Sequence, residues 1–220
     1  MNINDNCRDF LSILTSLAER DKQQIYIVGG ALRDSLTGKS SADYDFTSRD
    51  APRLAKQFAH YSKLPLVRLD DTPGRETFRV VIDKTLYFDF SRQQGNTLAE
   101  DLMRRDFTFN AMAITLKDFL EGNNNIIDPH HGINDLRSRI VRVLPGDIFA
   151  DDPLRMVRAF RFASTLNFTI EKETLEKITK HKTQLSRIAS ERIYYELSLF
   201  LSSRETYPHL ILMDKSGLLV

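Results

Sequence analysis

Two short motifs near the N-terminus have residue types and spacings that suit the binding of a phosphate and of a divalent cation. Gly29 and Gly30 follow a short apolar run, and two glycines between a strand and a helix let backbone N–H groups approach a phosphate closely. Arg33 could add a bidentate contact to the same phosphate. Asp43 and Asp45 alternate with aromatic residues, as on a strand with both carboxylates on one face. Because hard cations prefer oxygen ligands, these two carboxylates predict a metal site.

A third carboxylate could complete that site. Asp89 lies between two phenylalanines in a run with the alternation of a neighbouring strand. Three carboxylates would suit two Mg²⁺ ions roughly 3.5–4 Å apart, one lowering the pKa of an attacking 3′-hydroxyl and the other holding a triphosphate. A Gly-Gly pair alone is often only a turn, and an Asp-x-Asp run only a solvated strand face. Their order and short separation favour the functional interpretation.

A second set of polar residues recurs at helical spacing later in the chain. Asp152, Arg155 and Arg158 follow one another at intervals of three, which predicts one polar stripe on a helix. A carboxylate beside a guanidinium can accept from the exocyclic amine of cytosine or adenine and donate to the adjacent ring nitrogen, whereas guanine and uracil present a carbonyl. Each such contact discriminates by about 1–3 kcal/mol. The alternative is a helical ion pair worth a few tenths of a kcal/mol, which reads no base.

The elements that must position these residues are predicted from the spacing of apolar side chains. Helices are expected over 5–19, from Gly30 through Leu36, and over 51–61 and 99–113. Strands are expected over 24–28, 42–48, 67–70, 78–83 and 86–91, with a tight turn at Asp83-Lys84 and a strand or turn near 126–127. Beyond residue 134 the strand signal nearly disappears, and helices are expected over 152–166, 171–181, 188–202 and 207–219. The chain therefore divides into an α/β half and an all-α half, joined through 128–136.

Composition limits the class of protein. The 220 residues, 41% of them hydrophobic, suffice for one large domain or two modest ones. The formal net charge is +1, so any RNA contact must come from local clusters of basic residues. Cys7 is the single cysteine, which rules out an intramolecular disulfide and suits the cytosol. The sequence shows neither a secretory signal nor a run of about 20 apolar residues, so a cytoplasmic protein without a membrane span is expected.

Basic residues do gather in the second half of the chain. An RNA phosphate track could form there, although a solvated helical surface explains most of the lysines equally well. The residues are Arg137, Arg139, Arg142, Arg155, Arg158, Arg161, Lys172, Lys177, Lys180, Lys182, Arg187 and Arg192. The adjacent His130 and His131 do not predict a zinc site, because the chain has one cysteine and no suitably spaced partner histidines.

Five segments resemble, in order, the motifs of the class II CCA-adding enzymes and the bacterial poly(A) polymerases. They are IYIVGGALRDSLTGKSSADYDF (25–46), EDLMRRDFTFNAMAI (100–114), DPHHGINDLRSRIVRV (128–143), DDPLRMVRAFRFA (151–163) and ASERIYYEL (189–197). The resemblance implies an α+β fold, with a polymerase-β-like nucleotidyltransferase palm built on a small mixed sheet and followed by an all-α neck. It implies a palm over 1–136, a nucleotide-selecting neck over 137–205, and the start of a helical body over 206–220.

The same resemblance implies the roles of individual residues. Asp43, Asp45 and Asp89 would be catalytic, with Asp43 and Asp45 as ligands of two Mg²⁺ ions. Asn110 and Arg105 would contact the ribose and triphosphate of the incoming nucleotide, and a site that reads the 2′-hydroxyl favours NTP over dNTP. The full expected nucleotide-binding set is Gly29, Gly30, Arg33, Arg105, Asp106, Asn110, Asp152, Arg155, Arg158 and Arg161.

One pair in that set also follows from spacing. Asp106 and Asn110 are four residues apart, so on a helix both could reach one ligand. Without the resemblance, the Arg104-Arg105-Asp106 trio would be interpreted as a surface salt bridge.

The implied function is template-independent addition of C and/or A residues, from CTP and ATP, to the 3′ end of tRNA, with CC addition and whole CCA addition both open. The segment 91–100 is shorter than the flexible loop of full CCA-adding enzymes, which resembles the CC-adding branch. Asp151 stands where the family usually has Glu, so its supporting role is in doubt. The chain stops near where a body and tail would begin, which suggests a truncated chain or one that needs a partner. The alternatives are a poly(A) polymerase and a non-catalytic RNA-binding module of the same fold.

Overall fold

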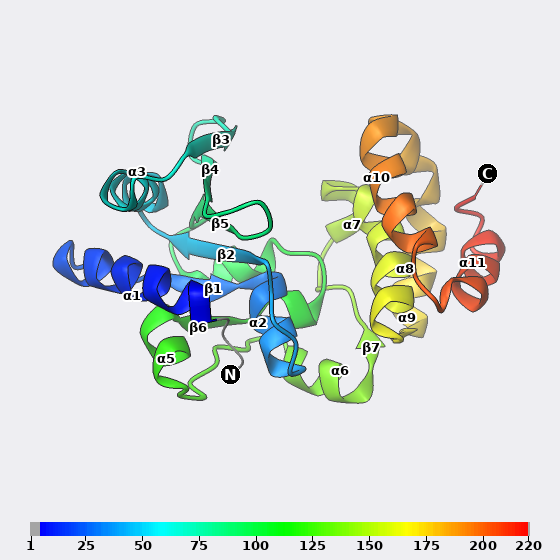
Figure 1. Cartoon of the computed structure of the whole chain (residues 1–220). Helices are drawn as coiled ribbons and strands as arrows, with labels where there is room; N and C mark the ends of the chain where they lie inside the picture. The colour runs from blue at the N-terminus through cyan, green and yellow to red at the C-terminus, as the bar shows by residue number, and fades with distance from the viewer. Residues whose placement is uncertain (1–4, 220) are drawn as a thin grey trace. The chain divides into compact units, whose positions relative to one another are not determined.

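The computed structural model describes residues 5–219, which form two compact units (Figure 1). Unit 1 comprises the chain up to Arg104 together with Asn110–Pro129. Unit 2 comprises Arg105–Phe109 and the chain from His130 onward. Within the described residues, no helix is both long enough and apolar enough to cross a membrane.

Unit 1 is built on a six-stranded mixed sheet with the strand order β3-β4-β5-β2-β1-β6. The strands are β1 (Tyr26–Val28), β2 (Asp43–Ser48), β3 (Leu66–Asp70), β4 (Thr77–Val81), β5 (Tyr87–Arg92) and β6 (Ala113–Thr115). The pair β2 and β5 is parallel, whereas the other neighbours are antiparallel. This confirms the predicted mixed sheet, and every strand expected before residue 92 is present.

Helices cover one face of this sheet. They include α1 (Asp5–Arg20) and α3 (Ala51–Ser62), which pack against each other, while α3 also packs on β4 and β5. The aromatic residues that alternate along β2 and β5 turn toward this layer, and the Phe58 ring of α3 stacks on Phe88 at a centroid distance of 5.6 Å. Truncating one such buried phenylalanine costs about 3–5 kcal/mol. The carboxylates between the aromatics therefore belong to the opposite, open face.

Three shorter helices complete unit 1. They are α2 (Gly29–Leu36), α4 (Leu98–Met103) and α5 (Leu116–Glu121). The Thr97 side chain caps α4 by accepting from the Glu100 N–H, and Thr115 caps α5 in the same way through Asp118.

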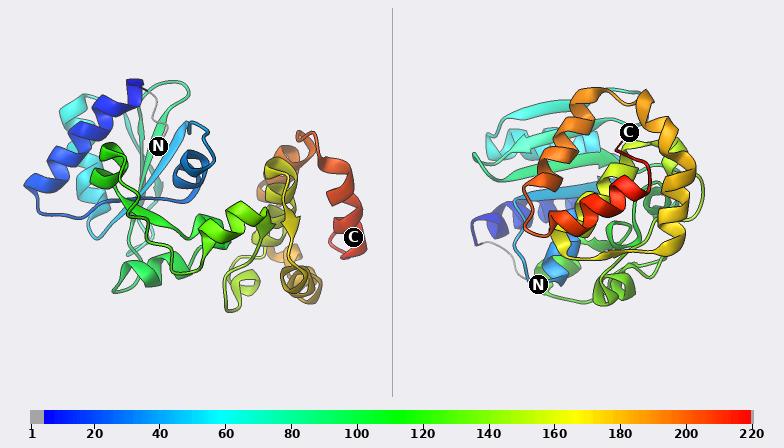
Figure 2. Two further views of the ribbon diagram at one scale, coloured as in Figure 1. Left: turned by 90° about the horizontal axis from the view of Figure 1, so that it is seen from below. Right: turned by 90° about the vertical axis from the view of Figure 1, so that its right-hand side faces the viewer.

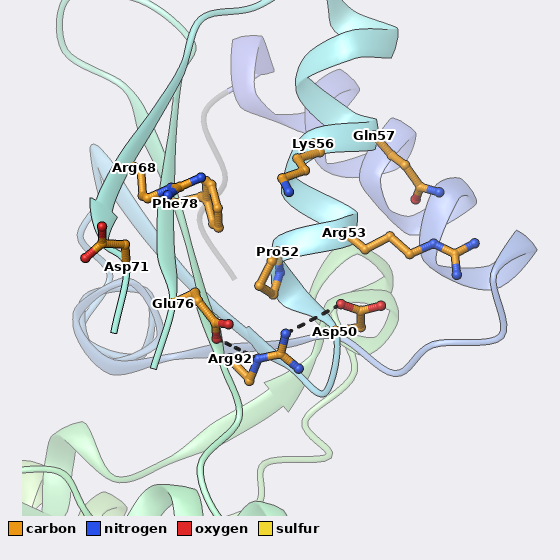
Figure 3. A pocket seen from close by; sticks show the side chains of 10 residues that line it. All are labelled: Asp50, Pro52, Arg53, Lys56, Gln57, Arg68, Asp71, Glu76, Phe78 and Arg92. Carbon is orange, nitrogen blue, oxygen red and sulfur yellow. Dashed lines mark hydrogen bonds and ion pairs between the residues drawn. The ribbon is translucent and has the colours of Figure 1, made fainter. Parts of the chain in front are cut away.

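A hollow of about 540 Å³ lies on the helix-covered face, between α3 and the β3–β4 hairpin (Figure 3). Phe78 lies in its wall, with Lys56 and Arg68 each about 5.5 Å from the ring centroid. Arg92 closes one end through an ion pair with Glu76. Because Phe78 pairs with Phe90 on the buried face, this hollow lies on the other side of the sheet from the carboxylates.

Unit 2 is mainly helical, and its longest helix lies at its centre. That helix is α8 (Leu154–Leu166), and both α10 (Ser190–Leu201) and α11 (Thr206–Lys215) pack on it (Figure 2). The others are α6 (Gly132–Ser138), α7 (Ile148–Asp151), α9 (Lys172–His181) and the 3₁₀ helix η2 (Lys182–Arg187). The half predicted as all-α also contains one short parallel ladder, between β7 (Ile140–Val141) and β8 (Thr169–Ile170).

The helix predicted over 99–113 is wrong beyond Met103. After α4 the chain becomes irregular, Phe107 pairs with Val143 in an isolated bridge, and Thr108–Asn110 forms a single 3₁₀ turn. The reason is packing: the Phe107 and Phe109 rings stack on each other, and each meets the Phe162 ring of α8 edge-on. Side-chain burial of this kind overrides a helical pattern.

The helix predicted over 152–166 begins two residues late. Asp152 is extended, with φ −145° and ψ 98°, and α8 starts at Leu154. Asp152 precedes Pro153, and a proline ring disfavours the helical conformation of the residue before it. The Asp152 carboxylate instead accepts a hydrogen bond from the Leu154 N–H at 3.2 Å.

The two units differ from the predicted ranges 1–136 and 137–205, because 105–109 and 130–136 associate with unit 2. The buried Asp135 carboxylate links these segments: it accepts from the Thr108 hydroxyl at 2.7 Å and from Arg142 Nε at 3.0 Å. Gly132 allows a close approach, since a Cβ there would lie 2.3 Å from the Thr108 carbonyl oxygen. The segment 206–220 contributes α11, and its assignment to a further body domain stays a prediction.

Replacing Gly132 by Ala is expected to destabilise unit 2 by about 1–3 kcal/mol, because the added methyl group meets a backbone carbonyl that cannot rotate away. Urea denaturation followed by circular dichroism measures the change. Ser138→Ala is the matched control, since Ser138 is exposed on the same helix and should change stability by less than about 0.5 kcal/mol. Equal stability of the two variants would contradict the close approach.

Candidate functional site

The open face of the unit 1 sheet presents the three carboxylates singled out in the sequence. In the parallel ladder Asp45 of β2 is opposite Asp89 of β5, and Asp43 is opposite Tyr87. Neighbouring strands lie about 4.8 Å apart, so Asp45 and Asp89 are lateral neighbours and Asp43 is two residues along the strand. Two residues of β2 and a third from the distant strand β5 thus share one face.

Arg79 extends this row, and the sequence analysis missed it. Arg79 of β4 is the direct partner of Asp89, and its Nε and Nη2 donate to Oδ1 and Oδ2 of Asp89, both at 2.7 Å. The guanidinium also lies 4.8 Å from the centroid of the Tyr87 ring. The predicted two-residue turn at Asp83-Lys84 would place residue 79 opposite residue 88, whereas the connection in the structure is one residue longer and places it opposite residue 89.

The charges in this row shift one another's pKa values. The hydrogen bonds from Arg79 to Asp89 raise the pKa of the guanidinium, so that it stays protonated. Desolvation raises the pKa of Asp43, the Arg79 charge opposes that rise, and the Asp89 charge adds to it. The row is therefore electrostatically coupled, with Arg79 as a counter-ion to the carboxylates.

Asp43 and Asp45 fit a divalent cation of the kind that is held by one or two carboxylates and completed by substrate phosphates and water. No group of three or more histidine, cysteine, aspartate or glutamate residues within the described chain forms a ready-made metal cluster. Asp89 has both oxygens engaged by Arg79. The two-ion arrangement inferred from the sequence stays a prediction.

The predicted phosphate-binding motif lies at the junction of β1 and α2. Gly29 has φ 66°, a left-handed conformation that suits glycine. The largely buried Arg33 side chain donates from Nη1 to the side-chain amide oxygen Oδ1 of Asn110 at 2.9 Å and from Nε to Oδ1 of Asp34 at 2.8 Å. Two motifs that are 77 residues apart are thereby joined within unit 1.

Unit 2 contains a network of four charges, in which the two carboxylates are buried and the two guanidinium groups are partly exposed. Asp106 accepts from Nε and Nη2 of Arg158 at 3.0 and 2.7 Å. Glu196 accepts from Arg158 at 2.9 Å and from Arg161 at 2.5 Å, and the Arg161 guanidinium lies 3.8 Å from the Phe162 ring centroid. Arg158 and Arg161, predicted to bind nucleotide, are thus held by carboxylates from two distant segments. Glu196 was missed, because nothing in its local sequence reveals partners 35 and 38 residues away.

The network shifts the pKa values of its two arginines in opposite directions. Burial alone would lower the pKa of Arg158, but the Asp106 and Glu196 charges outweigh it and raise that pKa. For Arg161 burial dominates and lowers the pKa, while Glu196 opposes the change. The charge of Glu196 is therefore needed by both guanidinium groups.

The predicted polar stripe on α8 is corrected, because Asp152 lies before the helix. Its Oδ2 pairs with Nη2 of Arg192 on α10 at 3.1 Å. Arg155 is in the first turn of α8, and its Nη1 donates to the Ile148 carbonyl oxygen at 3.4 Å. Asp152 and Arg155 remain three residues apart at the start of α8, now with Arg192 beside the carboxylate.

Asp106 and Asn110 do not lie on one helix, because α4 ends at Met103, and a ligand shared by the two residues stays a prediction. Asp106 belongs to unit 2 and pairs with Arg158, whereas Asn110 belongs to unit 1 and accepts from Arg33. Arg105, half-buried, belongs to unit 2 as well. Their separate partners follow from the end of the helix at Met103.

Replacing Glu196 by Gln is expected to destabilise unit 2 by about 1–3 kcal/mol, because it removes the buried charge that two partly exposed guanidinium groups share. Urea denaturation measures the loss. Glu191→Gln, at an exposed position of the same helix, should change stability by less than about 0.5 kcal/mol. Similar stabilities of the two variants would show that the network contributes nothing.

Two family models match the chain. The model described as the poly A polymerase head domain matches residues 25–74 and 75–142. The model described as the probable RNA and SrmB-binding site of polymerase A matches residues 167–220. Together they include most of the residues that the sequence analysis singled out.

Curated relatives are similar over nearly all of this chain. A CC-adding tRNA nucleotidyltransferase of Geobacter sulfurreducens is 36% identical over 211 residues, which cover 94% of this chain and 47% of the relative. A CCA-adding enzyme of Bacillus subtilis is 36% identical over 208 residues, which cover 88% of this chain and 50% of the relative. The chain therefore spans about half the length of the curated relatives it matches.

A solved structure has the same fold. It is a tRNA nucleotidyltransferase complexed with a primer tRNA and an incoming ATP analog, with a TM-score of 0.79 and 33% identity. The match covers 94% of this chain and 61% of that one.

Proposed function

Because this chain belongs to the family of class II tRNA nucleotidyltransferases and bacterial poly(A) polymerases, we propose that it adds C residues, or C and A residues, from CTP and ATP to the 3′ end of tRNA. The observation that carries the proposal is the row of Asp43, Asp45 and Asp89 on the open face of the sheet. The names of the relatives, CC-adding and CCA-adding, support the choice of tRNA. Since the chain matches about half of each relative, the proposal concerns the catalytic and nucleotide-selecting part.

The reaction joins a 3′-oxygen to the α-phosphorus of the nucleotide. The new P–O bond forms as the bond to pyrophosphate breaks, and the hydroxyl gives up its proton. A divalent cation bound by Asp43 and Asp45 would lower the pKa of that hydroxyl and neutralise charge on the triphosphate. In the proposal, backbone N–H groups at Gly29-Gly30 and the Arg33 guanidinium bind phosphate oxygens. Asn110, held by Arg33, contacts the ribose.

Base selection is assigned to Asp152 and Arg155 at the start of α8. Asp152 would accept from the exocyclic amine of C or A, and Arg155 would donate to the neighbouring ring nitrogen. The ion pair from Arg192 supports this role, because it orients the Asp152 carboxylate. Arg158 and Arg161, held by Glu196, would support the base-reading pair from the next turns of the helix.

The short connection before α4 favours CC addition over full CCA addition. β5 ends at Arg92 and α4 begins at Leu98, and the resemblance associates a longer loop there with the switch from C to A. A poly(A) polymerase is the second candidate, since one matching model carries that name. It would extend generic RNA with ATP alone.

An extension assay tests the function directly. A tRNA lacking its 3′ CCA is incubated with Mg²⁺ and CTP, ATP or both, and product lengths are read on a gel. Addition that stops after two C residues is expected. Three additions would assign the full CCA activity, and long tails with ATP on generic RNA would assign the poly(A) activity. No addition by this chain or by a version extended to the length of its relatives would overturn the proposal.

Replacing Asp43 or Asp45 by Ala is expected to abolish nucleotide addition while leaving the fold intact, because the cation loses a carboxylate ligand. The rate of CTP incorporation and a circular dichroism melt are measured together. Asp71→Ala, which removes an exposed carboxylate outside the row, is the control and should keep the native rate. Activity retained in both site variants would remove these residues as ligands.

Replacing Arg155 by Ala is expected to relax base choice. Loss of one base-reading contact should lower the preference for CTP over UTP about tenfold, from the roughly 1–3 kcal/mol that such a contact contributes. Single-nucleotide incorporation with each triphosphate measures the ratio. Arg137→Ala, at an exposed position on α6, is the control. An unchanged ratio in Arg155→Ala would exclude the base-reading role.

A further inference from the structure

The ion pair between Arg79 and Asp89 has a consequence for the proposed metal site. Asp45, Asp89 and Arg79 occupy neighbouring positions on β2, β5 and β4, in one row across the sheet. Asp89 therefore has a carboxylate on one side and a guanidinium on the other. Both of its oxygens accept from Arg79 at 2.7 Å.

This bidentate geometry limits what else Asp89 can bind. A carboxylate offers about four lone-pair positions, and the fork of an arginine uses one on each oxygen. Asp89 can then offer a cation only its remaining, outward lone pairs. Chelation by both oxygens requires that the guanidinium leave.

Arg79 is well fixed for this role. Its strand, β4, is hydrogen-bonded between β3 and β5, and its guanidinium lies against the Tyr87 ring at 4.8 Å. The side chains of Arg79 and Asp89 are 33% and 15% exposed, so water screens the pair only in part. The planar, always protonated guanidinium of arginine binds both carboxylate oxygens at once, whereas the ammonium group of a lysine would bind as a single point charge.

We propose that Arg79 is a positioning residue that competes with the divalent cation for Asp89. This inference rests on the proposed function, and it adds a ranking of the cation-binding carboxylates by affinity. Asp43 and Asp45 form the stronger cation site, whereas the site that includes Asp89 is weakened by the Arg79 charge and by the occupied oxygens. In the protein without metal, Arg79 instead relieves the repulsion between Asp89 and Asp45.

The test measures Mn²⁺ binding by electron paramagnetic resonance, in which the signal of free Mn²⁺ falls as the ion is bound. Arg79→Met removes the charge but keeps a long side chain, and the dissociation constant for Mn²⁺ should fall roughly tenfold. Arg79→Lys keeps the charge but cannot engage both Asp89 oxygens as the guanidinium does, so its dissociation constant should lie between those of the native chain and Arg79→Met. Unchanged Mn²⁺ binding by a folded Arg79→Met chain would overturn the inference.

Arg68→Met is the matched control. Arg68 lies on the neighbouring strand β3 opposite Phe78, on the other face of the sheet from Arg79. The variant removes an identical charge, so it should leave Mn²⁺ binding unchanged. A gain equal to that of Arg79→Met would mean that net charge alone acts, and would also overturn the inference.

A double variant keeps the test decisive if Arg79→Met does not fold. Arg79→Met combined with Asp89→Asn replaces an ion pair by two neutral side chains, and should bind Mn²⁺ as the native chain does. A tenfold loss would show that Asp89 already serves the cation beside Arg79, against the inference. Asp45→Ala distinguishes a failure of the proposed metal site from a failure of the role of Arg79. Native Mn²⁺ binding in Asp45→Ala would show that the proposed metal site is wrong. If Asp45→Ala binds Mn²⁺ more weakly but Arg79→Met does not bind it more tightly, only the proposed role of Arg79 is wrong.

Discussion

The parallel pairing of β2 with β5 is the constraint on which the candidate site of unit 1 depends. Parallel neighbours cannot be joined by a tight turn, so the chain needs a crossover between them. Here α3 and the β3–β4 hairpin provide it, and both pack against the ladder they connect. The crossover thus supplies the aromatic layer on one face and Arg79 at the edge of the row on the other. The register of this one ladder brings Asp45 beside Asp89.

In unit 2 the corresponding constraint is to hold two arginines of α8 in fixed positions with only partial access to solvent. Arg158 and Arg161 are adjacent on α8, and their charges would repel if they were buried alone. Asp106 and Glu196, both buried, approach them from segments 52 and 35 residues away. The guanidinium groups are thereby fixed in direction as well as neutralised. Guanidinium groups held in this way fit the proposed role of unit 2, which is to support hydrogen-bond donors to a nucleotide base.

Local periodicity predicted the strands and the face of the carboxylates well, because alternation along β2 and β5 depends only on neighbouring residues. It failed where a distant segment or a neighbouring proline decides the conformation. Phe107 and Phe109 leave the helical pattern because they pack on Phe162, and Asp152 is extended because Pro153 follows it. The pairings of Arg79 and Glu196 depend on register and on tertiary contacts. The phosphate- and base-binding roles came from residue types and spacing and those of Arg105 and Asn110 from the resemblance, and all of them stay predictions.

The path of the chain between the two units limits how the protein can be dissected. The chain leaves unit 1 after Arg104, returns at Asn110, and leaves again after Pro129. A cut at the last crossing alone would give a C-terminal fragment without Phe107 and Phe109, and so without two rings that cover Phe162. It would also leave Arg158 without Asp106. The helical half is therefore not an autonomous folding unit in linear sequence, and limited proteolysis between the units should release no stable C-terminal fragment.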